Sequence, residues 1–133
     1  MTPAQRRLAW FIAVGCVAAA VHFGVVVALV QRTGLSPLWA NCAAWGVALG
    51  VSFAGHWRLS FADQQAPLGR AARRFVALSA AGFAVNETVY ALLLRYSTAG
   101  YQAALAITLA LVAVGTFLLS RHWAFRGSSG AGP

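Results

Sequence analysis

The chain has 133 residues, of which 60% are hydrophobic and only 9% are charged. With a mean hydropathy of +0.70, this composition argues against a soluble enzyme, because soluble domains are about one quarter charged. All ten basic residues are arginines, the only acids are Asp63 and Glu87, and the formal net charge is +8. That charge would suit a nucleic-acid binder, but the arginines lie between long apolar segments and therefore indicate membrane topology instead.

Four apolar segments are each close to the length that crosses a bilayer. They run from about Leu8 to Val30, Leu38 to Trp57, Phe75 to Leu94 and Tyr101 to Leu119. Their continuous apolarity, without strict alternation, predicts helices instead of barrel strands. The predicted fold class is therefore an all-α membrane protein with four transmembrane helices. We expect residues 1–126 to form a single domain and the Gly- and Ser-rich residues 127–133 to form a disordered tail.

The first apolar segment also has features of a signal peptide. Arg6 and Arg7 precede it, and the run of alanines at 18–20 resembles a cleavage site. Its apolar residues continue to Val30, however, which is longer than the core of a typical signal peptide. We therefore expect an uncleaved first span.

The positions of the arginines predict the orientation. Arg32 and Arg95 lie at the two short turns 31–37 and 95–100, whereas the other eight lie at the opposite ends of the spans: Arg6, Arg7, Arg58, Arg70, Arg73, Arg74, Arg121 and Arg126. The positive-inside rule then predicts that both termini and the long connection from Arg58 to Arg74 are cytoplasmic.

The two predicted hairpins resemble each other in sequence. Arg6-Arg7 matches Arg73-Arg74, and residues 52–55 (Ser-Phe-Ala-Gly) match residues 116–119 (Thr-Phe-Leu-Leu). Both hairpins begin and end on the same side, so we predict two helical hairpins in a parallel repeat about an axis along the membrane normal.

Polar side chains recur at three- and four-residue steps along two of the spans, so that each set shares one helical face. The set in the second span is Asn41, Trp45, Ala48, Ser52 and His56, and the set in the fourth is Thr108, Val112, Thr116 and Ser120. If the two faces meet, they line a polar groove that opens toward the cytoplasm. Alternatively, the small hydroxyl groups bond to their own backbone and pack helices. Gly46 and Gly50 form a flat face for helix contact, either within the chain or between copies.

A further group of polar residues lies near the middle of the predicted spans. Along a helix, Arg7 and His22 are ~22 Å apart, and Arg74 and Glu87 are ~20 Å apart, so His22 and Glu87 reach a similar depth. A carboxylate at that depth is unfavourable unless it is paired or neutral. We therefore predict an intramembrane polar network in which His22 meets one or more of its candidate partners. The proposed members are His22, Asn41, Asn86, Glu87 and Tyr90. This network would guide a sugar, carry a proton, or simply clamp the helices together.

Several segments, in this order, resemble the GtrA-like family of small four-span membrane proteins. They are Arg6-Arg7 followed by Val14-Gly15, then Gly34-Leu35-Ser36-Pro37 and Ala40-Asn41, the segment 52–61 with its second copy 116–125, and Gly82, Asn86 and Tyr90. The resemblance covers about Arg6 to Arg126. It implies a protein of the bacterial inner membrane that moves a polyprenyl-phosphate-linked sugar to the periplasmic leaflet for cell-surface polysaccharide synthesis.

A lipid of that kind requires cations for its phosphate and polar or aromatic groups for its sugar. Arg58, Arg74 and Arg121 stand at predicted cytoplasmic helix ends, and a guanidinium group binds two phosphate oxygens at once. Trp123 is a candidate to stack on the sugar. His56, Ser52 and Ser120 are candidates for further polar contacts. Interfacial anchoring is the alternative role for the arginines and the tryptophan.

Three functions are compatible with these residues. The leading one is a flippase for a polyprenyl-phosphate-linked sugar. The second is a non-transporting membrane partner that anchors or orients a glycosyltransferase, and the third is a small proton-coupled exporter, for which Glu87 is the supporting residue. The sequence contains no nucleophile–base set, phosphate-binding glycine loop or metal-ligand spacing, so we expect no catalysis, cofactor, metal or nucleic-acid partner. Because four helices hardly enclose a path for a sugar phosphate, we expect a homo-oligomer, with a dimer as the default.

Overall fold

A computed structural model describes residues 1–60 and 67–126. For Ser60, Phe117 and residues 119–126 it describes the backbone but not the side chains. Within these ranges the protein is all-helical and consists of α1 (Pro3–Thr33), α2 (Pro37–Gly55), the π-helix η1 (His56–Ser60), α3 (Leu68–Tyr96) and α4 (Tyr101–Arg126). The predicted tail 127–133 and the middle of the predicted 58–74 connection lie outside the described residues.

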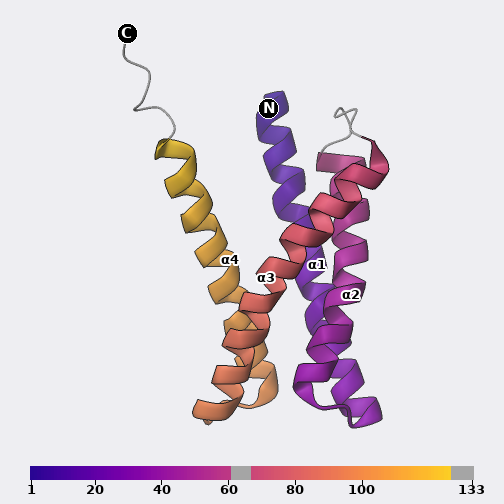
Figure 1. The fold of residues 1–133 in the computed structure, drawn as a ribbon, viewed down its shortest axis with the longest axis vertical. Helices are drawn as coiled ribbons and strands as arrows, with labels where there is room; N and C mark the ends of the chain where they lie inside the picture. Colours follow the sequence, from indigo (N-terminus) through magenta and orange to yellow (C-terminus); the bar gives the residue numbers. More distant parts are fainter. Residues whose placement is uncertain (61–66, 127–133) are drawn as a thin grey trace.

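The helices form two hairpins whose tight turns lie at the same end of the molecule (Figure 1). The start of α1, η1 and the end of α4 lie at the opposite end. Gly34 closes α1 in the left-handed conformation (φ 70°), and its N–H donates to the Val30 carbonyl at 3.1 Å. Pro37 then begins α2, since its fixed φ suits the first helical position and its missing N–H leaves no donor unsatisfied there.

Three helices, α1, α3 and α4, extend beyond their predicted apolar segments into polar sequence. α1 begins at Pro3 because Thr2 forms a capping box with Gln5, in which each side chain accepts from the other residue's backbone N–H. α3 begins at Leu68, inside the connection predicted to run from Arg58 to Arg74, and α4 continues to Arg126. Alanine and arginine favour helix even outside the apolar region, so hydropathy marked the spans but not the helix ends.

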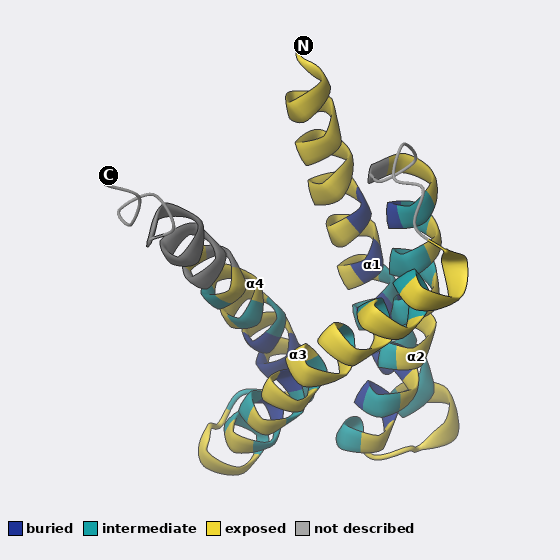
Figure 2. Ribbon diagram, turned by 45° about the horizontal axis from the view of Figure 1, so that its top comes forward, coloured by how far each residue is buried: buried dark blue, intermediate teal, exposed yellow. Residues whose placement is uncertain are grey.

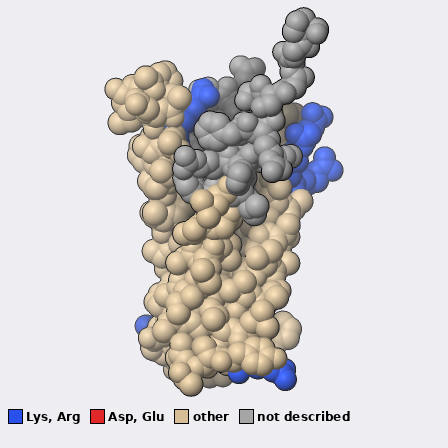
Figure 3. All heavy atoms as spheres, turned by 90° about the vertical axis from the view of Figure 1, so that its left-hand side faces the viewer, with Lys and Arg blue, Asp and Glu red and all other residues tan. Residues whose placement is uncertain are grey.

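Three segments of the described chain are long and apolar enough to cross a membrane: Pro3–Thr33, Pro37–Leu59 and Leu68–Tyr96. In α4 the corresponding apolar stretch is the shorter Tyr101–Thr116. The arginines lie near the two ends, and on the face shown in Figure 3 the band between them carries no charged side chain among the atoms described. This distribution is that of a multi-pass membrane protein.

The core lies toward the end that contains the two turns, where all four helices contribute buried side chains. Its fully buried members are Val26, Ala40, Ala44, Tyr90, Ala104 and Leu105. Among the α4 side chains that the structure describes, the buried ones lie within 104–108, and those after them are exposed or half-buried (Figure 2). α4 therefore packs against α3 near their turn and separates from it toward the other end (Figures 1 and 2).

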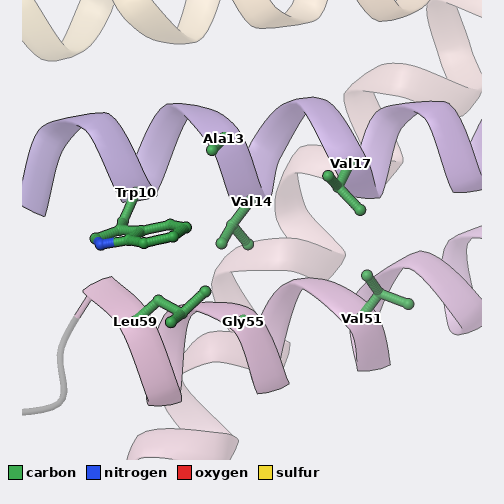
Figure 4. A pocket seen from close by; sticks show the side chains of 7 residues that line it. All are labelled: Trp10, Ala13, Val14, Val17, Val51, Gly55 and Leu59. Atoms are coloured by element: carbon green, nitrogen blue, oxygen red, sulfur yellow. The ribbon is translucent and has the colours of Figure 1, made fainter.

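α1 and α2 pack against each other, and Gly55 permits a close approach between them. A Cβ at Gly55 would lie 2.7 Å from Cγ1 and 2.9 Å from Cγ2 of Val14. Beside this contact lies an apolar crevice of about 200 Å³ between the two helices (Figure 4). In contrast, Gly46 and Gly50 are exposed, and nothing among the described residues comes within 4 Å of a Cβ placed there. The predicted small-residue face therefore makes no close helix contact with the described part of this chain.

Candidate functional site

The centre of the bundle contains a hydrogen-bonded network around the side chain of Asn41. Asn41 Oδ1 lies 2.6 Å from His22 Nε2. Asn41 Nδ2 donates to Asn86 Oδ1 at 2.9 Å and to Glu87 Oε2 at 2.6 Å. One amide thus connects three helices, since His22 belongs to α1, Asn41 to α2, and Asn86 and Glu87 to α3.

The burial of these residues fits a position inside the bundle. Asn41 is fully buried, His22 and Asn86 are buried, and Glu87 is half-buried. The network connects His22 and Glu87, the two residues for which helix geometry predicts a similar depth. His22 reaches Glu87 through Asn41, however, and not by a direct bond.

Tyr90 does not share these hydrogen bonds, although the sequence places it on the same face of α3 as Asn86. Its side chain is fully buried, and its hydroxyl donates to the Tyr101 carbonyl at 3.2 Å. Tyr90 therefore ties α3 to the start of α4, next to the network.

The direction of the hydrogen bonds follows from the chemistry of the amide. Nδ2 supplies two protons, and it has two oxygen acceptors on α3. Oδ1 accepts only, so the ring nitrogen Nε2 of His22 must carry the proton that it shares with Asn41. The network consequently has a fixed polarity, with its donor end at His22 and its carboxyl end at Glu87.

A pocket of about 180 Å³ with both apolar and polar lining residues adjoins the network on the side away from the turns. All four helices line it, and its polar side chains are His22, Trp45, Ser52 and Ser79. His22 thus belongs both to the network and to the wall of the pocket. The helix faces elsewhere in the membrane-spanning region are largely apolar.

The indole ring of Trp45 is held in this wall from two sides. Its Nε1–H donates to Ser79 Oγ at 3.0 Å, and its ring stacks on Phe83 with centroids 4.9 Å apart and an interplanar angle of 17°. Both partners lie on α3, so Trp45 joins α2 to α3 on the side of the Asn41 network that faces away from the turns. A buried or partly buried indole typically has such a polar partner for its N–H.

Among the side chains that the structure describes, the polar face predicted for the fourth span does not line this pocket. The Thr108 hydroxyl is buried and donates to the Ala104 carbonyl of its own helix at 2.8 Å, and Thr116 is exposed. The residue that α4 contributes to the pocket is Leu109. For Thr108 the alternative role, a hydroxyl that bonds to its own backbone in a packed helix, is the one observed.

The other predicted substrate-binding residues whose side chains the structure describes lie apart from this pocket. His56 is buried in an aromatic cluster, with its ring centroid 4.7 Å from that of Phe11 and 5.9 Å from that of Phe75. Arg58 of η1 and Arg74 of α3 are exposed at the end of the molecule opposite the turns. The side chains of Ser120, Arg121 and Trp123 lie outside the described residues.

Sequence reasoning missed Ser79 and Phe83, which position Trp45. The signal that would have found them is the three- and four-residue spacing of 79, 83, 86 and 90 in α3, which places all four on one face with Asn86 and Tyr90. In the described ranges, no three or more His, Cys, Asp or Glu side chains gather in an arrangement that could hold a metal ion.

Comparison with protein families gives one match that covers most of the chain. Residues 10–125 match the family described as GtrA/DPMS, transmembrane domain. The chain belongs to this family. It is therefore a multi-pass membrane protein related to the polyprenyl-phosphate-sugar flippases. Comparison with curated proteins and comparison with solved structures each gave no match.

Proposed function

We propose that this GtrA/DPMS protein flips a polyprenyl-phosphate-linked sugar from the cytoplasmic to the periplasmic leaflet of the bacterial inner membrane. The observation that carries the proposal is the pocket in which the polar side chains of His22, Trp45, Ser52 and Ser79 lie among apolar ones. An apolar bundle does not need such a pocket for its stability, because polar groups inside a membrane are unfavourable unless they serve a purpose. A sugar crossing the membrane requires polar groups of this kind.

The side chains of the pocket suit a sugar ring. Trp45 offers a flat apolar face, and Ser52 and Ser79 offer hydroxyl groups that both donate and accept hydrogen bonds. His22 adds a ring nitrogen, because its other nitrogen is already bonded to Asn41. Apolar surface with a few polar groups is the usual composition of a small-molecule site.

The protein also offers surfaces that suit the phosphate and the isoprenoid chain of the lipid. Arg58 and Arg74 are exposed near the end of the bundle that we propose faces the cytoplasm, where the phosphate of an arriving lipid would lie. α3 and α4 separate toward that same end (Figure 1). This supports a lateral route along which the isoprenoid chain remains in the bilayer while the sugar enters. A homodimer is part of the proposal, since four helices alone hardly enclose the path.

The experiment that tests the proposal is translocation in proteoliposomes. A radiolabelled polyprenyl-phosphate hexose with a shortened isoprenoid chain is added outside, and its protected fraction is measured over time. Trp45→Ala should slow translocation about tenfold or more, the size expected when a specific binding contact is lost. Trp39→Ala is the matched control, because Trp39 lies on the same helix but is 69% exposed.

The outcomes separate the candidate functions. Equal rates in protein-containing and protein-free vesicles would contradict the flippase. If that result came with tight binding of a glycosyltransferase, the anchoring function would replace it. If Trp45→Ala and Trp39→Ala changed the translocation rate equally, the protein would still be a flippase, but the pocket would not be the path of its sugar.

A further inference from the structure

The Glu87 carboxyl group is the one acidic side chain in the described residues, and its hydrogen-bond partners there are the neutral groups of Asn41 and Cys42. It lies half-buried within the spans, where Oε2 accepts from Asn41 and Oε1 lies 3.9 Å from Cys42 Sγ. An isolated carboxylate at this depth is strongly unfavourable. A compensating proton or a compensating positive charge must therefore be close to it.

His22 is the basic group that Glu87 can reach, through the single amide of Asn41. The other titratable groups that face Glu87 are Cys42 of α2 and Tyr90 of α3, with Tyr101 of α4 behind Tyr90. Their thiol and hydroxyl groups carry no charge when protonated. With one titratable proton shared between them, His22 and Glu87 are neutral as a pair, whether the proton is on the imidazole or on the carboxyl group. Asn41 Nδ2 can donate to Oε2 in either case.

The histidine end of this pair lines the pocket that we propose admits the substrate, and the inference therefore rests on the proposed function. A phosphodiester carries one negative charge. When that charge enters a region of low dielectric constant, its attraction to a neighbouring proton is much stronger than in water. A second titratable proton would give the His22–Glu87 pair a charge of +1, and the loaded site would then be neutral.

We propose that the network of His22, Asn41 and Glu87 takes up one proton when the phosphodiester of the lipid-linked sugar enters the bundle, and releases it when the lipid leaves. The proton compensates the phosphate while it is away from both the arginines and the water. No covalent bond forms or breaks in this step other than those to the transferred proton.

Proton uptake on binding is measurable without translocation. The purified full chain is titrated with the short-chain polyprenyl-phosphate hexose by calorimetry, in two buffers of different ionisation enthalpy at the same pH near neutrality. We expect about one proton bound per ligand, and an apparent Kd that weakens about tenfold per unit rise in pH over the range of linked uptake. The same hexose on a polyprenyl ether without phosphate should bind without protons.

The variant that removes both titratable groups is His22→Gln combined with Glu87→Gln, which keeps amide hydrogen bonding at both positions. It should bind the phosphodiester with no linked proton, whereas Thr88→Val should behave as wild type. Thr88 is exposed next to Glu87, and its hydroxyl donates to Ala84 of its own helix. If the double variant does not fold, the comparison of the two ligands on wild type still decides the question.

The results distinguish this inference from the function on which it rests. Wild-type protein that binds and translocates the lipid without linked protons would overturn the inference and leave the flippase intact. The same would follow if the phosphate-free ligand were bound with as many protons as the phosphodiester. Wild-type protein that neither binds nor translocates the lipid would overturn both.

Discussion

Substitution of Gly55 by alanine should separate α1 from α2, because the added methyl group has no room. Its Cβ would lie 2.7 and 2.9 Å from the two methyl carbons of Val14, and real Cβ contacts essentially never come so close. Valine in a helix has one strongly preferred rotamer, so its methyl groups cannot turn away. We expect a loss of about 1–3 kcal/mol, the usual cost of overpacking.

The structure also predicts which second substitution restores stability. Val14→Ala removes both methyl groups and leaves only Val14 Cβ, which is 3.4 Å from the new Cβ, at the border of ordinary van der Waals contact. Gly55→Ala combined with Val14→Ala should therefore be no less stable than Val14→Ala alone. The coupling energy in this double-mutant cycle should be about 1–3 kcal/mol in favour of the pair.

Reversible unfolding of the purified protein in mixed micelles, followed by circular dichroism, measures these differences. Gly50→Ala is the control, because nothing described lies within 4 Å of a Cβ at Gly50. There we expect a change near zero or a small gain from the higher helix propensity of alanine. The reasoning is refuted if Gly55→Ala and Gly50→Ala are equally stable, or if the effects of Gly55→Ala and Val14→Ala simply add.

The remaining predictions concern the network and the arginines. Asn41→Ala leaves Glu87 and His22 without their shared partner and should destabilise the fold by about 1–3 kcal/mol. Thr108→Val should destabilise it less, because the Thr108 hydroxyl bonds only to its own helix. The same unfolding assay measures both variants, and equal losses of stability would contradict the bridging role of Asn41. Arg58→Gln should weaken binding of the lipid phosphate about fivefold in low salt, as measured by calorimetry. Arg95→Gln, at the opposite end of the molecule, should leave the binding unchanged. Equal weakening by the two variants would contradict the proposal that the phosphate binds at the end that contains Arg58.

The four helices could be predicted from the sequence because the signals for them are local. Continuous apolar runs identify the spans, and Gly34 with Pro37 marks the first turn. The exact helix ends could not be predicted from hydropathy, since the capping box at Thr2 and the helix-favouring Ala-Arg segment before Phe75 extend helices into polar sequence. Mean hydropathy over a window of residues detects neither a capping box nor helix propensity.

The network was only partly predictable for a different reason. Counting residues along each helix gives the depth of His22 and Glu87, because the rise per residue is fixed. Which side chain connects them depends on how α2 is rotated against α1 and α3, and that rotation is set by packing at other positions such as Gly55. Asn41 was therefore a candidate member but not a predictable centre, and Ser79 was indistinguishable from a small packing residue.

The predicted repeat gives a reason for the difference between the two hairpins. In the alignment of residues 52–55 with 116–119, Leu119 occupies the position of Gly55, and Ala81 occupies that of Val14. The close contact that Gly55 permits in the first hairpin requires a residue without a side chain. Because leucine is much larger than glycine, the repeat predicts no contact between α3 and α4 as close as the one between Val14 and Gly55. We therefore expect the second hairpin to be the more open of the two, which is the arrangement that the proposed lateral entry of the lipid requires.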